Sequence, residues 1–307
     1  MRMLLLFVIY MSVTFFKTIG QPRETIESFR SKIVSFGVVS KMKIFDSLNN
    51  FKLKEFYDVV GSGIVCYVPY KDDLMLCVVT AKHVLYDPKI GYAPRSLKIR
   101  FANKDTLSVT EYLGEDVMLY TSKGESYWFP HPDSTVDLVC LPLSEGDNFS
   151  FVRNGHTSIS TLSYSSFANE NDLYESKSIL CAGFPGVVGS DYLTRAIFRN
   201  GIIAWTSPKK PELNNFLIDC NVFPGNSGGP VFVNNGILPL GDSLSLRFAG
   251  IVIQKRRKIN NVFNEKMDVI KDGLGKVVFS EESIGIGIVV PYGRVQELLN
   301  AFMNAIK

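Results

Sequence analysis

Short runs of apolar, β-branched and aromatic residues recur along the chain, and Gly, Pro, Asn and Asp separate them. The expected strands cover residues 33–39, 64–68, 74–80, 96–101, 136–141, 178–182, 196–205, 216–220, 248–253 and 284–290. Short strands at this spacing are typical of antiparallel β-barrels, so the pattern predicts an all-β protein. Near the C-terminus the apolar period changes. Val295, Leu298, Leu299 and Phe302 fall at helical spacing and predict an amphipathic helix over 295–306.

The N-terminus has the pattern of a targeting segment. Arg2 supplies a positive charge, an apolar core covers residues 3–16, and Lys17 ends it. The core is short for a membrane span, and small residues precede a possible cut near Gln21. We therefore expect a cleavable signal peptide over residues 1–20, a secreted or periplasmic mature chain, and no stable membrane span after cleavage. The alternative is an uncleaved N-terminal membrane anchor.

Composition narrows the function classes. Of 307 residues, 46% are hydrophobic and 21% charged, which is ordinary for a globular chain with a sizeable core. Lysine and arginine number 33 against 30 acidic residues, a balance of +3 that favours no polyanionic partner, so no nucleic acid is expected.

The five cysteines lie in or beside apolar runs and lack the close spacing of metal ligands. No metal and no cofactor is therefore implied. Buried, reduced thiols are the favoured interpretation. Cys66 and Cys77 could also meet across a hairpin and form a disulfide, and the sequence leaves that alternative open.

The hexapeptide GNSGGP at residues 225–230 places Ser227 in a turn that few residue types can make. Its glycines permit positive φ and close approach of another backbone. Successive N–H groups of such a turn can converge on the negative oxygen that forms when a hydroxyl attacks a carbonyl. The simpler interpretation is a Gly-rich turn with an incidental serine.

A histidine and an aspartate occur upstream in comparable settings. His83 follows the apolar run 74–79, so it is expected at a rigid strand end, where a general base is well held. His131 and His156 lie in loop-like sequence and are expected to be structural or solvated. His83 could also be an ordinary residue at a strand end.

Asp137 opens an otherwise apolar strand and is expected to be partly buried. A buried carboxylate is costly without a partner, and a histidine N–H is a suitable one. Asp137 could instead cap local backbone N–H groups. Asp133 is the rival candidate, although its loop setting gives less positional control.

In this order, the three blocks resemble the trypsin-like serine peptidases, and most of all the protease domain of the HtrA/Deg type. The matching segments are GSGIV at 61–65, TAKHV at 80–84, DLV at 137–139, the serine block at 218–230 and IGIGIVVP at 284–291. The similarity extends from about residue 33 to about residue 299. Only about 16 residues follow Pro291, so the PDZ domain of HtrA proteins is not expected.

The resemblance implies a chymotrypsin/trypsin-like fold: two packed antiparallel six-stranded-type β-barrels with a short C-terminal helix. The mature protease domain would cover residues 21–307, with an N-terminal barrel at about 31–145 and a C-terminal barrel at about 176–307. His83 and Asp137 would belong to the first barrel and Ser227 to the second, with the site in the cleft between them.

By the same resemblance, the chain is expected to be a secreted serine endopeptidase that cuts protein or peptide substrates through an acyl-enzyme intermediate. Ser227 would be the nucleophile, His83 the general base, and Asp137 the residue that orients His83. The backbone N–H groups of Gly225 and Ser227 would form the oxyanion hole.

The resemblance also assigns substrate-binding residues. Asn221 would lie near the floor of the primary pocket, with residues 250–253, Gly250 and Ile251 among them, and residues 284–288 in its walls. No acidic residue is evident among them, so an uncharged, small-to-medium aliphatic residue is expected before the cut. Asn226 stands where zymogen-activated relatives carry an aspartate, so we expect no activating cleavage after Lys32.

Two other function classes remain open at this stage. The chain could be a catalytically silent protein of the same fold that acts as a binding module. It could also be a structural β-barrel protein with a coincidental motif, but that would leave the ordered histidine, aspartate and serine blocks unexplained.

Overall fold

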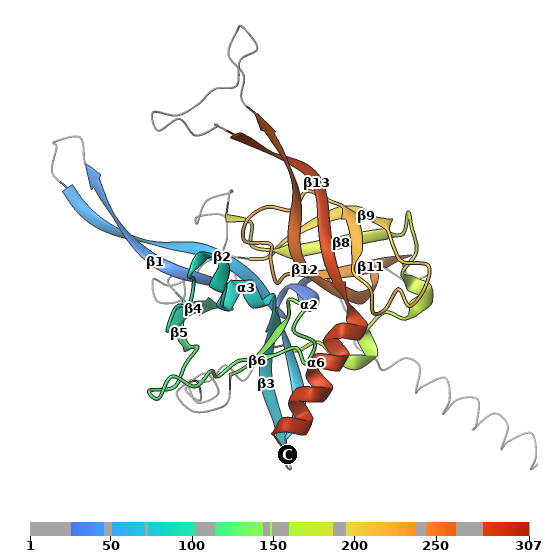
Figure 1. Cartoon of the computed structure of the whole chain (residues 1–307), viewed down its shortest axis with the longest axis horizontal. Helices are drawn as coiled ribbons and strands as arrows, with labels where there is room; N and C mark the ends of the chain where they lie inside the picture. The colour runs from blue at the N-terminus through green and yellow to red at the C-terminus, as the bar shows by residue number, and fades with distance from the viewer. Residues whose placement is uncertain are drawn as a thin grey trace, which may run out of the picture.

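The computed structural model describes residues 26–45, 51–70, 73–101, 114–143, 148, 160–186, 195–237, 244–261 and 279–306. Figure 1 shows two β-sheet units side by side, with one helix lying across their junction. The predicted signal peptide at 1–20 and the loop residue His156 lie outside the described residues.

The first unit is an antiparallel seven-stranded sheet with the strand order β5-β4-β1-β2-β3-β7-β6. Its strands are β1 (Ile33–Phe45), β2 (Phe51–Tyr70), β3 (Asp73–Thr80), β4 (Ser96–Arg100), β5 (Glu115–Met118), β6 (Phe129–Pro130) and β7 (Val139–Pro142). Side chains from distant strands, among them Phe36, Val65 and Leu141, form one buried cluster on this sheet. The sheet therefore has an apolar core of its own.

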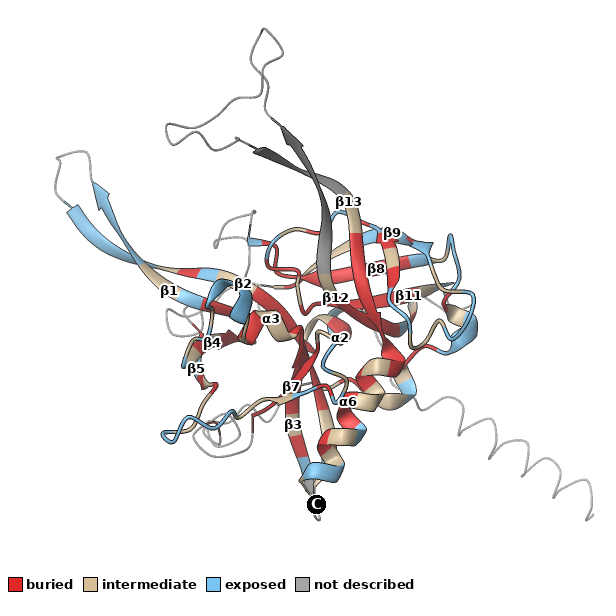
Figure 2. Ribbon diagram, viewed as in Figure 1, coloured by how far each residue is buried: buried red, intermediate tan, exposed pale blue. Residues whose placement is uncertain are grey.

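The second unit is a closed six-stranded barrel with the order β10-β13-β12-β11-β8-β9. Its strands are β8 (Ser178–Gly183), β9 (Ile197–Trp205), β10 (Phe216–Asp219), β11 (Pro230–Ile237), β12 (Leu244–Asn261) and β13 (Phe279–Pro291). Phe216, Phe232 and Phe248 are completely buried inside it. The burial colours in Figure 2 show that the buried residues concentrate in the two sheets and along one side of the helix.

The helix α6 (Tyr292–Ala305) covers the junction of the two units and contacts β2, β7, β12 and β13. The four residues predicted to form its apolar face are buried, as are Tyr292 and Gly293, and the helix begins at Tyr292 rather than Val295. The prediction of an all-β fold with two β units and a short C-terminal helix is thus confirmed, with full hydrogen-bonded closure in the second unit. None of the helices in the described part of the chain is long and apolar enough to cross a membrane.

The chain enters the first sheet from a short helix, α2 (Ile26–Arg30), which packs on the barrel. The Phe29 ring is 1% exposed and meets the Phe232 ring edge-on, with their centroids 4.9 Å apart. Lys32 follows as a buried residue, its ammonium 4.5 Å from the centre of the Phe29 ring. The segment before β1 is therefore part of the packed structure.

Strands β1 and β2 are longer than predicted and extend past the sheet as a two-stranded ribbon, seen at the upper left of Figure 1. Residues 38–45 pair with 51–58, whereas the neighbouring strand β4 pairs only as far as Gly37. Tyr57 anchors the base of the ribbon. Its hydroxyl donates to the backbone oxygen of Ser35 at 2.9 Å, and the Arg100 guanidinium lies 4.2 Å from its ring centre.

Tyr57 predicts a loss of stability in alkaline solution. Burial raises the pKa of its phenol above the ordinary value of 10.0, against smaller opposite effects from the hydrogen bond with Ser35 and from Arg100. The folded chain therefore holds Tyr57 neutral where the unfolded chain ionises. The neutral phenol therefore contributes to the free energy of unfolding in full below pH 10.0. Above that pH the free energy of unfolding falls by up to about 1.4 kcal/mol per pH unit.

Urea unfolding between neutral and strongly alkaline pH measures this effect, with Tyr57→Phe as the matched variant. The variant is expected to be less stable near neutral pH, by about 1 kcal/mol for the lost hydrogen bond, and to lose stability less steeply above pH 10. Parallel curves for the two proteins would contradict the assignment to Tyr57.

Candidate active site

His83 and Asp137 are joined directly. His83 lies on the one-turn helix α3 (Lys82–Leu85) that follows β3, and Asp137 lies just before β7. One Asp137 carboxylate oxygen is 2.7 Å from His83 Nδ1, and the other accepts the His83 backbone N–H at 3.1 Å. Both side chains are about one third exposed, at 34% and 32%. The carboxylate thus holds both the ring and the backbone of His83, with Nδ1 as the protonated ring nitrogen and Nε2 as the available base.

A second set of contacts holds the segment before Asp137. His131 is buried, its backbone N–H donates to the Leu138 carbonyl at 3.0 Å, and its Nδ1 accepts the Asp133 N–H at 3.0 Å. Its Nε2 lies 3.4 Å from the Glu297 carboxylate on α6. Of the two roles expected for His131, the structural one is correct. Asp133, the rival of Asp137, caps this loop by accepting the Thr135 N–H at 3.0 Å.

Ser227 lies in the turn between β10 and β11 and is partly exposed. Its carbonyl accepts the Ser62 N–H at 2.7 Å, and the Ser62 carbonyl accepts the Thr80 hydroxyl at 2.6 Å. Thr80 stands three residues before His83 in the sequence. The Ser227 turn and the His83 turn therefore flank the same stretch of β2. Among the described residues, His83 and Ser227 have no hydrogen bond with each other.

The glycines of the turn are required by close backbone approach. Gly228 has φ +83°, and a Cβ atom there would stand 2.0 Å from the Ser62 carbonyl oxygen and 2.1 Å from the Thr80 hydroxyl. Any side chain at this position would separate the two sheets. Gly225 has φ +93°, and a Cβ there would stand 2.3 Å from the Phe184 carbonyl oxygen.

Two N–H groups of this turn have no protein acceptor among the described residues. In the part of the chain that the structure describes, neither the Gly225 N–H nor the Ser227 N–H donates to another protein group. The neighbouring N–H groups of Asn226 and Gly228 are used, by the carbonyls of Phe223 and Val252. Pairs of free backbone N–H groups at a tight turn are suited to an oxyanion.

Asn226 orders this turn without a charge. Its side chain is almost wholly buried, and its Oδ1 accepts the Phe223 N–H at 3.0 Å. Ser62 adds a second tie: its hydroxyl donates to the Gly225 carbonyl at 2.7 Å and accepts the Phe184 N–H at 2.9 Å. The loop conformation therefore depends on neutral hydrogen bonds within the folded chain.

The residues predicted to bind substrate lie in different settings. Asn221 is exposed and its carbonyl accepts a hydrogen bond from Arg199 at 2.7 Å. Gly250 and Ile251 are buried within the barrel and pair with β11 and β13 on both sides. Ile253, further along β12, contacts the apolar clusters of both units and is only partly buried. Ile253 therefore lies at the junction where a substrate could reach.

The five cysteines form no disulfide in this arrangement. All five are buried free thiols, so the disulfide left open for Cys66 and Cys77 is not formed, although the two residues are cross-strand partners. Burial raises the pKa of the Cys66 thiol well above 9.0, which disfavours the reactive thiolate. No group of His, Cys, Asp or Glu among the described residues is arranged to hold a metal ion.

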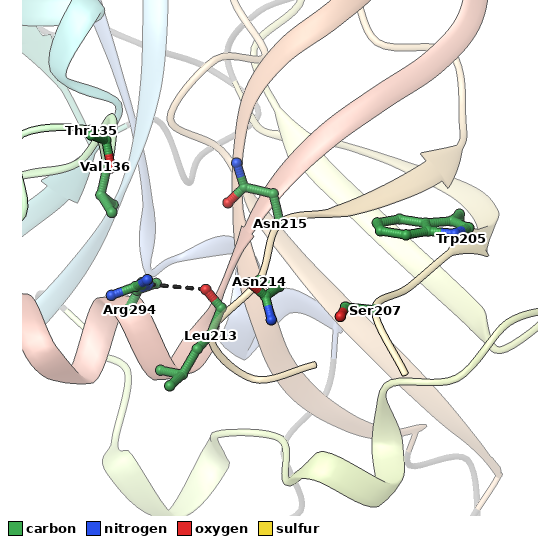
Figure 3. A pocket seen from close by; sticks show the side chains of 8 residues that line it. All are labelled: Thr135, Val136, Trp205, Ser207, Leu213, Asn214, Asn215 and Arg294. Carbon is green, nitrogen blue, oxygen red and sulfur yellow. Dashed lines mark hydrogen bonds between the residues drawn. The ribbon is translucent and has the colours of Figure 1, made fainter. Parts of the chain in front are cut away.

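A pocket of about 360 Å³ lies beside the aspartate loop, between that loop, the barrel and α6 (Figure 3). Its lining residues are Thr135, Val136, Trp205, Ser207, Leu213, Asn214, Asn215 and Arg294. Arg294 donates to the Leu213 carbonyl at 2.9 Å and to the Glu297 carboxylate at 2.8 Å. Sequence reasoning missed this pocket because its walls come from four separate segments, none of which carries a motif.

Comparison with known proteins gives a family match. A family model described as a trypsin-like peptidase domain matches residues 61–238, more than half of the chain. Among solved structures, an HtrA-type protease, AlgW, crystallised with a tripeptide, is 13% identical, with a TM-score of 0.45 over 91% of this chain and 62% of that one. The chain therefore spans less than two thirds of the AlgW chain.

The active form of the Rv3671c protease from M. tuberculosis is 15% identical, with a TM-score of 0.42 over 91% of this chain and 83% of that one. An inactive form of the same protease gives the same identity and TM-score over 90% and 91%. No protein with a curated description matches the chain.

The hydrogen bonds of the Ser62 hydroxyl predict that its removal lowers the stability of the fold considerably. Ser62→Ala leaves the Phe184 N–H and the Gly225 carbonyl without their partner, so the free energy of unfolding is expected to fall by about 2 kcal/mol or more. Denaturant unfolding measures this, with the exposed Ser122→Ala as control, for which a change within about 0.5 kcal/mol is expected. Equal effects of the two substitutions would contradict the role given to Ser62.

Proposed function

The chain belongs to the trypsin-like peptidase family, and we propose that it is a serine endopeptidase that hydrolyses peptide bonds through an acyl-enzyme intermediate. One observation carries this proposal. A histidine held by a carboxylate at 2.7 Å lies beside a glycine turn that presents a partly exposed serine and free N–H groups.

In the proposed reaction, Asp137 keeps the proton of His83 on Nδ1, so Nε2 has a lone pair for the Ser227 hydroxyl. Nε2 removes the hydroxyl proton of Ser227 as Ser227 Oγ attacks the carbonyl carbon of the substrate. The imidazolium that results is stabilised by the Asp137 carboxylate. It then gives the proton to the leaving amine, which departs and leaves an ester on Ser227. A water molecule, activated by the same nitrogen, hydrolyses the ester.

The N–H groups of Gly225 and Ser227 are proposed to bind the oxygen that becomes negative during each attack. Asn226 and Ser62 already hold the turn by hydrogen bonds. The two N–H groups therefore need little reorganisation when negative charge develops on the substrate oxygen. His83 and Ser227 have no hydrogen bond in the described structure. Hydrogen bonds between catalytic groups are often long in unliganded enzymes and tighten when substrate binds.

For specificity we propose an uncharged, small-to-medium aliphatic residue before the cut, with Asn221 at the floor of the pocket and Ile253 in its wall. Asp219 is the acidic residue that comes close. Its carboxylate and the Asn221 amide oxygen lie 4.0 and 3.4 Å from the same point, a Cβ built on Gly285. Peptide-library profiling of the wild type and Asp219→Asn tests this. The two profiles should agree, and dominant cleavage after Lys or Arg would contradict the proposal.

We also propose that the protein is exported, because residues 1–20 have the pattern of a cleavable signal. Its partners would be protein or peptide substrates. Mass spectrometry of the protein recovered from its native host tests the proposal. A mature N-terminus near Gln21 is expected, and recovery of Met1 would support the anchored alternative.

Ser227→Ala is expected to abolish covalent labelling by a fluorophosphonate probe and to lower peptidase activity by about 10⁴-fold or more. His83→Ala should have a similar effect, because members of such a set act as a unit. Ser122→Ala, an exposed serine elsewhere on the first unit, is the control and should label like the wild type. A wild type that does not label would favour the alternative function, a silent binding module of the same fold.

Lys32→Gln is expected to leave activity unchanged, because no activating cut occurs after Lys32. Lys32 is 4% exposed and its carbonyl accepts the Val65 N–H at 2.8 Å, so the bond to Ile33 is protected. Asn226, moreover, has no charge to bind a new N-terminus. Intact mass of the probe-labelled protein is the measurement. An active form that begins at Ile33 would refute the prediction.

A further inference from the structure

The ribbon formed by residues 38–45 of β1 and 51–58 of β2 exposes an unusual amount of apolar surface. More than half of the large hydrophobic side chains that the described residues expose belong to it: Val38, Met42, Ile44, Phe45, Phe51 and Leu53, at 39% to 62% exposure. Figure 2 shows the end of this ribbon as exposed on both strands. A concentrated exposed apolar surface rimmed by polar groups marks an interaction site.

Lysines alternate with these apolar residues. Three neighbouring cross-strand pairs each join one lysine to one apolar residue: Met42 with Lys54, Lys43 with Leu53, and Ile44 with Lys52. Lys41 lies one pair nearer the sheet, with its ammonium 3.0 Å from the Glu55 carboxylate. Over residues 41–55 the sequence has four lysines against Asp46 and Glu55, a net charge of +2. The end of the ribbon is therefore both apolar and cationic.

The ribbon has no second layer in the described structure. Its residues 38–45 and 51–58 pair with each other alone, and a two-stranded ribbon in water has little stability of its own. Lysines along strand edges disfavour edge-to-edge pairing with another copy. Its base is nevertheless fixed by Tyr57, so the apolar end is held away from the body by about 26 Å, eight residues of strand beyond Gly37.

Both faces of the ribbon carry the same chemistry. Successive residues of a strand point to opposite faces, so Val38, Met42 and Ile44 share one face with Lys52 and Lys54. Lys43 shares the other face with Phe45, Phe51 and Leu53. A single protein partner would cover one face and leave the other in water. The headgroup region of a bilayer surrounds whatever enters it, and anionic headgroups match the lysines.

We propose that the β1–β2 ribbon docks on an anionic membrane surface. Its phenylalanines and aliphatic side chains enter the boundary between headgroups and acyl chains, and Lys43, Lys52 and Lys54 bind lipid phosphates. Because the ribbon prolongs two inner strands past the end of the first sheet, docking leaves the His83–Asp137 pair on the body of the protein, clear of the bilayer. This inference does not depend on peptidase activity.

Vesicle flotation of the full chain tests the proposal. Phosphatidylcholine vesicles measure any binding by other segments, the N-terminal apolar segment included. Vesicles that also contain phosphatidylglycerol measure the contribution of charge. The wild type is expected to bind the anionic vesicles more tightly, with the difference reduced by salt. Lys43→Gln/Lys52→Gln/Lys54→Gln is expected to lose about 100-fold in affinity for the anionic vesicles only.

The matched control removes three exposed lysines elsewhere: Lys89→Gln/Lys123→Gln/Lys209→Gln. It lowers the net charge equally, so an equal loss of binding in the control would overturn the proposal. So would anionic binding that the ribbon variant retains.

A second measurement locates the contact. Phe45→Trp should show a blue-shifted emission and quenching by brominated lipid when anionic vesicles are added, whereas Ile90→Trp, at another exposed site, should show neither. Circular dichroism checks that the variants fold. Dimerisation in solution that Phe45→Ser/Phe51→Ser abolishes, without vesicle binding by the wild type, would assign the ribbon to a second copy and refute membrane docking.

Discussion

The candidate site depends on the backbone and hydroxyl of one residue, Ser62, which joins the two β units. Its N–H donates to the Ser227 carbonyl, its carbonyl accepts from the Thr80 hydroxyl, and its hydroxyl donates to the Gly225 carbonyl. The three distances are 2.6 to 2.7 Å. Glycine at position 228 is what allows the strand and the turn to come so close. The relative position of the histidine on one unit and the serine on the other is thus set by a few short, buried hydrogen bonds, which tolerate almost no shift in register.

The sequence was sufficient for the parts of this site that lie in continuous motifs. Glycines at positive φ and an aspartate opening an apolar strand have local causes, so the turn around Ser227 and the residue pair His83–Asp137 could be named in advance. The cores of both units could also be anticipated from their apolar strands. Strand β11 was not predicted. Residues 230–234 pair in the barrel, and the pairing with β12 is irregular at Asn235 and Gly236.

What could not be predicted arises from contacts between distant segments. The ribbon of β1 and β2 alternates lysines with apolar residues, but no local pattern indicates that these two strands extend past the sheet without a second layer. The family resemblance assigned residues 250–253 to a pocket wall, and the sequence could not show that the barrel buries Gly250 and Ile251 and leaves Ile253 partly buried at the junction. The lining of the pocket beside Asp137 follows from how α6 crosses both units, which no local pattern encodes.

The position of α6 has a consequence for when the site can come into being during synthesis. His131, which holds the segment before Asp137, lies next to the Glu297 carboxylate of α6. The barrel closes only when β13 pairs with β10 and β12. A nascent chain that has released the histidine, aspartate and serine segments still lacks the strand and helix that hold them in place. The candidate site would therefore be complete only after the ribosome has translated residues 279–305.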